Sequence, residues 1–320
     1  MTKIVSLLNL FWQRQQLHRQ RFNAGGFLQW SVGAARITKI TEMEGTGFGP
    51  FLLPQARPES VRHDAEIPGG HKNAQGAIKL SVHSFVIEIA GRRILVDTGI
   101  GNHKRRKVPV WNRLNLPFLS DLALAGFPPD SIDTVVCTHL HTDHVGWNTR
   151  LSGADWIPTF RHARYLFGEE EFRFWQAALD DPVRRQVFSD SVQPVVDAKL
   201  VEFASAGDQI VPGVRLVATP GHTAHHLSVQ IESEGEAALI AGDFVHHTAQ
   251  VGDPQWSSSF DHDPVMAAQT RRRLFAQLAD TRATLFGTAF PDPTAGTLVA
   301  VGDAFSFRPR PADRVIPWSE

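Results

Sequence analysis

The sequence predicts an α+β protein in which two β-sheets pack together and helices cover their outer faces. Strand-like apolar runs come first, a helical segment follows, and further strands, a second helix and a last strand complete the order. Several of the strand-like runs begin or end at a histidine or an aspartate, which places polar side chains at the sheet edges. Because sheets and helices bury their apolar faces against one another, this order favours two packed sheets between helices.

Local patterns predict the individual elements. Residues 34–43 alternate between polar and apolar side chains, and the runs AIKLSVHSFVIEI and RRILVDTG flank a short AGR turn as a hairpin. Further strands are expected at TVVCTH, VRLVATP, HLSVQIE, ALIAGD and ATLFGT, and a helix at GEEEFRFWQAAL. Asp263 and Pro264 predict the N-cap and first turn of a second helix. The segment GTGFGPFLLPQARPES is rich in glycine and proline and predicts a long loop.

The chain is expected to divide into an N-terminal helical arm at residues 1–33 and one further domain at 34–320. Five apolar residues of the arm fall at helical spacing on one face: Ile4, Leu7, Leu8, Phe11 and Trp12. This face is expected to pack on its own domain or on a second subunit, and a helix at a membrane surface is the alternative. No apolar run approaches the length needed to span a membrane, so no membrane partner is expected.

Composition excludes several classes of function. A formal net charge of -1 provides no general attraction for nucleic acid. The basic segment NHKRRKVPVWNRL is interpreted as a solvated surface rather than a nucleic-acid contact. The chain has one cysteine, Cys137, so it cannot form an internal disulfide, and a reducing, cytoplasmic compartment is expected. Cys137 lies in an apolar run, as expected of a small core residue.

The segment THLHTDHVGW carries the strongest chemical signal. It places His139, His141, Asp143 and His144 within six positions at the end of a predicted strand. Imidazole and carboxylate groups suit zinc, iron or manganese. Alternating side-chain directions in a loop that leaves a strand would let this one segment serve two metals.

Three further residues lie at predicted strand ends. The PGHT turn presents His222, and the run ALIAGD presents Asp243, whose carboxylate could bridge two cations. Asp97 follows the strand RRILV, where an acid could accept the second N–H of a ligand histidine and hold its tautomer.

This set of motifs resembles the metallo-β-lactamase superfamily over roughly residues 78–300. Within it, the long loop before the hairpin, the PGHT turn and the FPDPTAG segment look most like methyl parathion hydrolases and N-acyl-homoserine lactonases. The resemblance implies a four-layer αββα sandwich and often a homodimer. It also implies a first metal on His139, His141 and His222, a second on Asp143 and His144, and Asp243 as the bridge, with His226 as a supporting residue.

The sequence departs from this family at one position. The family has a last metal-binding histidine before its Phe-Pro motif, where this chain has Ala289. The resemblance therefore implies one firmly bound zinc and a weakened second site. Replacement by His246, His247 or His262 is the alternative. His246 also matches a position where the lactonase branch often has a tyrosine that contacts the substrate carbonyl, and the single tyrosine, Tyr165, does not match it.

The resemblance implies a metal-dependent hydrolase of small molecules, in which a metal-bound hydroxide attacks an ester, lactone or phosphotriester. If loss of the second metal frees Asp143, its carboxylate could act as general base or deliver a proton to the leaving group. Aromatic residues in segments expected to flank the cleft suggest an apolar substrate: Phe118, Trp147, Trp156, Trp175 and Trp256. Each of these aromatic residues taken alone is more typical of the core. The alternatives are a mononuclear iron enzyme similar to persulfide dioxygenases, and a metal-stabilised binding protein with a degraded active site.

If the arm mediates a homodimer, deletion of residues 1–22 is expected to change the oligomeric state or lower the solubility, because its apolar face loses its partner. Sedimentation velocity on the full and shortened chains measures this, and an identical sedimentation profile would contradict the interpretation.

Overall fold

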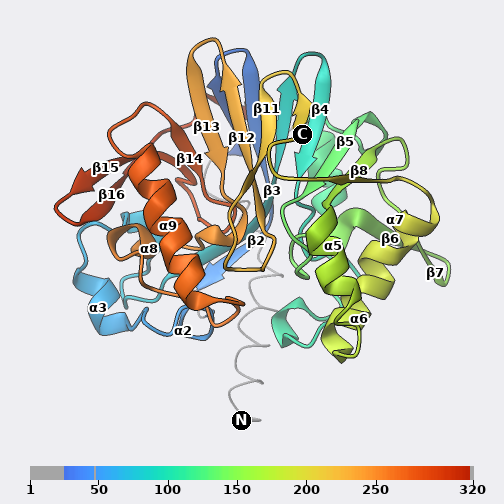
Figure 1. Cartoon of the computed structure of the whole chain (residues 1–320), viewed down its shortest axis with the longest axis horizontal. Helices are drawn as coiled ribbons and strands as arrows, with labels where there is room; N and C mark the ends of the chain where they lie inside the picture. The colour runs from blue at the N-terminus through green and yellow to red at the C-terminus, as the bar shows by residue number, and fades with distance from the viewer. Residues whose placement is uncertain (1–24, 47, 318–320) are drawn as a thin grey trace.

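Two β-sheets face each other in the middle of the molecule, and helices cover their outer faces (Figure 1). The structure is a computed structural model that describes residues 25–46 and 48–317. The predicted sandwich of two sheets between helices is confirmed. The apolar face of the predicted 1–22 arm lies outside the described residues.

The first sheet has eight strands. Its β1 to β4 region is antiparallel, whereas β4, β5, β8 and β9 run parallel. In spatial order the strands are β17 (Arg314–Pro317), β1 (Gly26–Val32), β2 (Ala35–Thr46), β3 (Lys79–Ile89), β4 (Arg92–Val96), β5 (Thr134–Cys137), β8 (Arg164–Gly168) and β9 (Val201–Ala204).

The second sheet has seven strands, and only its β13–β14 pair is parallel. A separate hairpin is formed by β6 (Thr149–Ser152) and β7 (Asp155–Pro158). In spatial order the strands of the second sheet are β10 (Gln209–Val211), β11 (Val214–Ala218), β12 (Leu227–Ser233), β13 (Glu236–Ile240), β14 (Thr284–Phe286), β15 (Ala295–Val301) and β16 (Ala304–Pro309).

Helices flank the sheets on both sides (Figure 1). Beside the first sheet lie α4 (Phe118–Leu124), α5 (Glu169–Gln176), α6 (Pro182–Val187) and α7 (Gln193–Asp197). The other side carries α2 (Gly49–Leu52), α3 (Pro58–His63), α8 (Ala249–Gly252) and α9 (Pro264–Leu278). Asp263 caps α9 as predicted, because its carboxylate accepts a hydrogen bond from the backbone N–H of Met266 at 2.9 Å.

Alternation along the strands explains the layers. On β4, Ile94 and Val96 pack into the apolar interface between the sheets, while Leu95 faces the helices. Cys137 on β5 is buried on the helix side, as predicted for a small core residue. Because successive strand side chains point to opposite faces, a segment buried on both faces is apolar at every position, as Ile94–Val96 of β4 and Val135–Cys137 of β5 are.

The structure moves one domain boundary. Residues 26–32, which the sequence analysis assigned to the arm, form β1 and pair with β2 and β17 in the first sheet. The sheet domain therefore includes residue 26 rather than starting at 34. The predicted long loop after β2 contains two short helices, α2 and α3, each with a proline in its first turn.

The basic segment after β4 is not simply a solvated surface, which corrects that interpretation. Lys104 and Arg106 are buried, and Arg106 makes a two-pronged ion pair with Asp190 at 2.7 and 2.9 Å. Burial lowers the pKa of Lys104 to about 7, although Asp190 opposes the shift. Two of the five basic side chains of this segment therefore lie inside the protein, whereas Arg105, Lys107 and Arg113 are exposed. Among the described residues, no helix is long and apolar enough to cross a membrane.

Buried Glu42 holds the loop that leaves β4. Its carboxylate accepts hydrogen bonds from the backbone N–H groups of Ile100 (2.6 Å) and Gly101 (3.0 Å) and from the indole of Trp147 (2.7 Å). Burial raises the pKa of Glu42 to about 7, against the lowering effect of these three hydrogen bonds. The contact joins the bulge within β2 to two loops that carry Asp97 and His144.

The Glu42→Gln substitution is expected to destabilise the fold by about 1–3 kcal/mol, because the new amide N–H₂ faces N–H donors and leaves a buried group unpaired. Guanidinium unfolding measures the change. Glu88→Gln on β3 is the control, since Glu88 forms surface ion pairs with Arg36 and Arg93, and such pairs contribute at most about 1 kcal/mol to the free energy of unfolding. Equal stability of the two variants would contradict the role of Glu42.

Candidate metal centre

One edge of the sandwich gathers the polar residues that follow its central strands. Asp97 follows β4 and His139 lies two residues beyond β5, whereas Asp243 follows β13 in the second sheet. His222 lies in the turn between β11 and β12. Because β4 and β5 are parallel, their ends meet at the same edge, and packing of the two sheets brings the remaining residues to it.

Three histidines converge on one point. The Nε2 atom of His139 lies 2.9 Å from Nδ1 of His141, which in turn lies 2.9 Å from Nε2 of His222. His139 and His222 are buried and His141 is half-buried. At most one nitrogen of each such pair can donate a proton to the other, so three converging imidazoles are better suited to a shared cation than to one another.

Asp243 is surrounded by imidazoles. Its Oδ2 atom has a ring nitrogen of four histidines within 4.0 Å: His144 at 3.2 Å, His246 at 3.3 Å, His222 at 3.5 Å and His139 at 4.0 Å. The other oxygen, Oδ1, is buried without a hydrogen-bond partner in the described part of the chain. Buried carboxylate oxygens normally have partners, so this arrangement fits a bound cation.

The orientation of His144 is set by Asp97. The Nδ1 atom of His144 lies 2.8 Å from Oδ2 of Asp97, and Asp97 also accepts hydrogen bonds from the backbone N–H and hydroxyl of Thr138. With Nδ1 bound in this way, Nε2 of His144 is directed toward Asp243. Asp97 therefore occupies the supporting position that its place after β4 predicts.

Asp261 supports His222 in the same way. Its Oδ1 atom lies 2.9 Å from Nδ1 of His222, and its Oδ2 accepts a hydrogen bond from the backbone N–H of Ser258 at 3.0 Å. The loop is tied to the His222 turn, because the backbone N–H of His262 donates to the carbonyl of His222. Sequence patterns do not mark Asp261 as part of the site, since an acidic residue in a loop 39 positions from His222 carries no local signal.

His226 is fully engaged in positioning Asp243. Its Nε2 accepts a hydrogen bond from the backbone N–H of Asp243 at 2.8 Å, and its Nδ1 lies 2.7 Å from the hydroxyl of Thr219. Gly242 has a φ of 61°, and a Cβ there would meet the His226 ring at 2.5 Å. A glycine is therefore required for the turn that directs Asp243 into the cluster.

The electrostatics of the cluster are strongly coupled. Burial and neighbouring imidazoles lower the pKa values of His139 and His141, which keeps both rings neutral and able to bind a metal. Burial also opposes protonation of His144, but the Asp243 and Asp97 carboxylates outweigh it and raise its pKa. Burial opposes ionisation of Asp243, yet His144 and His246 hold its pKa well below the usual range.

The donor set fits divalent zinc or a similar ion. Three groups of ligand atoms each lie within 4.8 Å of one another: His139, His141 and His222; His139, His144 and Asp243; and His222, His246 and Asp261. Two ligands about 2.05 Å from a tetrahedral zinc lie about 3.4 Å apart, close to the 3.2 and 3.5 Å separations of Asp243 from His144 and His222.

Asp143 lies at the partly exposed edge of the cluster, and Ala289 lies in a loop beside Asp243. The carboxylate of Asp143 is 3.8 Å from Nε2 of His144, remains 22% exposed, and has a raised pKa because burial disfavours its charge. The loop of Ala289 runs beside Asp243, since the hydroxyl of Thr288 donates to the carbonyl of Gly242. The backbone of Ala289 accepts a hydrogen bond from Ser81, while its methyl side chain offers no donor to a metal.

The aromatic residues expected around the cleft are mostly core residues. Phe118 and Trp147 stack inside the domain with ring centroids 5.6 Å apart, and Trp156 lies against Lys104. Trp256 packs beside the α2–α3 region. Only Trp175 touches the cluster, with its ring 5.6 Å from that of His141. Most of this set therefore serves packing, which corrects the pocket interpretation.

A different set of aromatic residues lies nearby at the surface. Phe48 contacts both Phe51 and Trp111, and Phe51 contacts Phe260 at 5.4 Å between ring centroids. Phe260 adjoins Asp261, and Phe51 and Phe260 remain 54% and 38% exposed. No local sequence pattern marks this group, because its members come from three segments that only the tertiary structure brings together.

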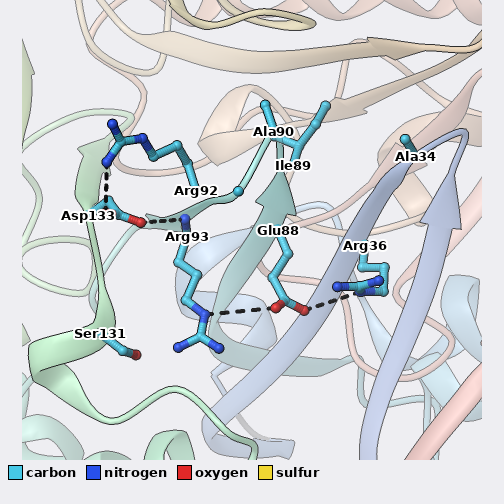
Figure 2. Close-up of a pocket in the computed structure, with 10 residues that line it drawn as sticks. Ala34, Arg36, Glu88, Ile89, Ala90, Arg92, Arg93, Ser131 and Asp133 are labelled. Carbon is cyan, nitrogen blue, oxygen red and sulfur yellow. Dashed lines mark hydrogen bonds and ion pairs between the residues drawn. The ribbon is translucent and has the colours of Figure 1, made fainter.

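A hollow elsewhere on the surface is not part of the cluster. Figure 2 shows it lined by Arg36, Arg92 and Arg93, with Glu88 and Asp133 pairing with these arginines. It lies at the start of β4, whereas the cluster lies beyond the end of the same strand. A five-residue strand is about 16 Å long, so the two regions are well separated.

Comparison with known families agrees with this geometry. Residues 77–288 match the metallo-beta-lactamase superfamily. The chain belongs to that superfamily. The prediction made from the His139–His144 motif, His222 and Asp243 is therefore confirmed at the level of the family.

Individual relatives carry more specific names. An N-acyl homoserine lactonase of Bacillus thuringiensis is 28% identical over 176 residues, which cover 51% of this chain and 63% of that protein. The chain thus spans less than two thirds of that relative. The N-acyl homoserine lactonase AiiB of Agrobacterium fabrum is 24% identical over 234 residues, covering 66% of this chain and 80% of the relative.

Solved structures share the fold. The hydrolase AbOPH of the beta lactamase superfamily superposes with a TM-score of 0.75 at 23% identity, covering 91% of this chain and all of that one. AidC, described as a dizinc quorum-quenching lactonase, gives a TM-score of 0.73 at 20% identity and covers 90% and 99% of the two chains. These likenesses establish the αββα arrangement that the sequence resemblance implied.

The Asp261→Asn substitution is expected to weaken zinc binding by about 10–100-fold, because a neutral amide holds the His222 ring less firmly. Competition with a chromophoric chelator measures the affinity. Asp263→Asn is the matched control two residues away, since asparagine caps a helix as well as aspartate. Unchanged zinc affinity in Asp261→Asn would show that His222 needs no support from this loop.

Proposed function

We propose that the protein is a metal-dependent hydrolase that acts on an ester, lactone or phosphotriester bond of a mainly apolar small molecule. The observation that carries the proposal is the convergence of imidazole nitrogens on the Asp243 carboxylate. Membership of the superfamily supports it, as do the names of the N-acyl homoserine lactonase relatives.

Each metal has a set of residues that would hold it. His139, His141 and His222 would hold the first, Asp143 and His144 the second, and Asp243 would lie between them. Zinc suits these donors, and iron or manganese is compatible with the same nitrogen and oxygen groups. A divalent ion bound here would lower the pKa of a coordinated water and polarise the substrate oxygen.

The side chains of the chain have distinct tasks in this reaction. Asp143 is partly exposed at the edge of the cluster, and when the weakened second site is empty its carboxylate would be free to accept a proton and return it to the leaving group. Asp243 keeps its negative charge and orders the surrounding rings. His246 is buried beside Asp243 and is a candidate for contact with the substrate oxygen.

The exposed aromatic group formed by Phe48, Phe51, Trp111 and Phe260 favours an apolar substrate. Phe260 lies next to Asp261, which contacts the ligand histidine His222. Apolar surface beside a polar centre is typical of small-molecule sites, because burial provides affinity while polar groups fix orientation. An acyl or aryl group bound here would have its reactive bond close to the cluster.

The absence of a side-chain ligand at Ala289 keeps two other functions open to test. A mononuclear iron enzyme similar to persulfide dioxygenases would contain iron and consume oxygen with a persulfide substrate. A metal-stabilised binding protein would hold metal without turnover of esters, lactones or phosphotriesters.

The zinc-loaded protein is expected to hydrolyse at least one class among N-acyl lactones, aryl esters and phosphotriesters. The His141→Ala variant is expected to lose more than about 100-fold in kcat/KM, because a direct ligand matters at least as much as an outer partner. His225→Ala is the control, since this neighbouring histidine is exposed and outside the donor groups. Full metal content without any turnover would contradict the proposed hydrolase.

A further inference from the structure

We infer that Arg184 binds a carboxylate group of the substrate, so that the protein favours apolar esters or lactones that carry one negative charge. The inference rests on the proposed function and names a substrate class for the same site. It follows from the aromatic rings that hold the Arg184 guanidinium, from the contacts of these rings with the candidate metal centre and from the lack of an acidic partner.

Two aromatic rings of α5 hold the guanidinium of Arg184, which belongs to the neighbouring helix α6 (Figure 1). Its Cζ atom lies 5.0 Å from the ring centroid of Phe174 and 5.4 Å from that of Trp175. A cation is attracted to the face of an aromatic ring at such distances. Arg184 and Phe174 are half-buried and Trp175 is buried, so the guanidinium is packed rather than free in solvent. A side chain held in this way loses little further freedom when it binds a ligand.

One of these rings links Arg184 to a proposed metal ligand. The Trp175 ring lies 5.6 Å from the ring of His141, with an angle of 70° between the ring planes. Burial is the largest cause of the lowered pKa of His141, and the positive charge of Arg184 is a smaller cause that acts in the same direction. The guanidinium therefore lies beside the candidate metal centre, with the indole of Trp175 in contact with both.

The other ring, that of Phe174, connects Arg184 to the loops around His222. Its centroid lies 6.1 Å from the ring of His225, which is in the same turn as His222, and 5.1 Å from the ring of His262. The backbone N–H of His262 donates to the carbonyl of His222 at 3.0 Å. His225 and His262 are both exposed. Arg184 and Phe174 therefore lie at the rim of the metal centre, where a ligand can reach them from solvent.

Arg184 has no acidic partner within the described part of the chain. Its guanidinium makes neither a hydrogen bond nor an ion pair with residues 25–46 or 48–317. The other two arginines of α5 and α6 are engaged, because Arg173 pairs with two glutamates of its own helix and Arg185 donates to two backbone carbonyls. The nearby Asp181 caps α6, and its Oδ1 accepts hydrogen bonds from the backbone N–H groups of Val183 and Arg184. The charge of Arg184 is thus left for a group from outside the chain.

A carboxylate of the substrate is the group that fits this position. The guanidinium has a planar fork of N–H donors that matches the two oxygens of a carboxylate, and arginine keeps its charge at physiological pH. The half-buried ring of Phe174 offers apolar surface beside the charge, as is typical of small-molecule sites. Because Arg184 contacts the rings of α5 rather than the cluster itself, its carboxylate partner must lie several bonds from the bond that is cleaved. The substrate class is therefore an apolar ester or lactone whose chain ends in a carboxylate.

The test compares two substrates that differ only in this charge, the p-nitrophenyl half-ester of suberic acid and its methyl ester. The ratio of their kcat/KM values is measured for the zinc-loaded full chain, for Arg184→Met and for Arg184→Lys. Arg173→Met is the matched control, because it removes an exposed arginine of the adjacent helix that already has acidic partners. Both substrates are cleaved by the same protein sample, so a loss of folding or of metal cancels in the ratio.

We expect the full chain to favour the half-ester. Arg184→Met is expected to lower the ratio at least about 10-fold, the effect of losing a hydrogen bond to a charged group. The loss is expected in KM rather than in kcat, because a contact far from the reacting atoms is the same in the ground state and the transition state. Arg184→Lys keeps the charge without the fork and is expected to give an intermediate ratio, and Arg173→Met to match the full chain. An unchanged ratio in Arg184→Met would overturn the inference.

A binding measurement separates this inference from the proposed function. Isothermal titration of the zinc-loaded protein with octanoate, and with the neutral octanamide as reference, is expected to show tighter binding of octanoate to the full chain. Arg184→Met is expected to reduce that preference at least about 10-fold, whereas a carboxylate bound only by the metal would keep it. If neither ester is hydrolysed, the proposed hydrolase is contradicted and the titration alone decides the role of Arg184. Equal affinity of the full chain and Arg184→Met for octanoate, or binding to neither, would then overturn it.

Discussion

The carboxylate of Asp243 is the group on which the rest of the site depends. One of its oxygens has ring nitrogens from His139, His144, His222 and His246 within 4.0 Å. A buried carboxylate is costly unless positive charge or hydrogen bonds compensate for its lost hydration. Here the compensation comes from imidazoles that are themselves buried, so the carboxylate and the rings stabilise each other only as a unit. A divalent cation would complete that unit, because it would satisfy the lone pairs of Oδ1, which has no hydrogen-bond partner among the described residues.

Supporting contacts fix the outer nitrogen of the principal rings. Asp97 holds His144 from behind, Asp261 holds His222, and the hydroxyl of Thr138 lies 3.0 Å from Nδ1 of His139. Each ring therefore has its second nitrogen committed to the protein, and its first is directed into the cluster. Rings held in this way lose little freedom when they bind a metal, which favours affinity and precise geometry.

The site is divided between the two sheets. The loop that follows β5 of the first sheet carries His139, His141 and His144, while His222 and Asp243 lie in turns of the second sheet. The apolar interface between the sheets sets their separation, so packing in the core determines distances at the edge. Glu42 contributes to the same alignment from the bulge within β2, where its carboxylate accepts hydrogen bonds from Gly101 and Trp147 of two neighbouring loops. A substitution in this core is thus expected to shift one sheet relative to the other and so to change the distances between the site residues.

The sequence by itself determined the two-sheet class, the superfamily and the short motif that runs from His139 to His144. These features are local: strand periodicity, helix caps and metal-ligand spacing are carried by residues close together along the chain. Only the tertiary structure decided that Asp261 supports His222, that β1 joins the first sheet, and that most of the expected cleft aromatics are core. Such contacts join distant segments whose approach is set by sheet packing, and a side chain such as His246 shows its missing partners only when every neighbour is in place.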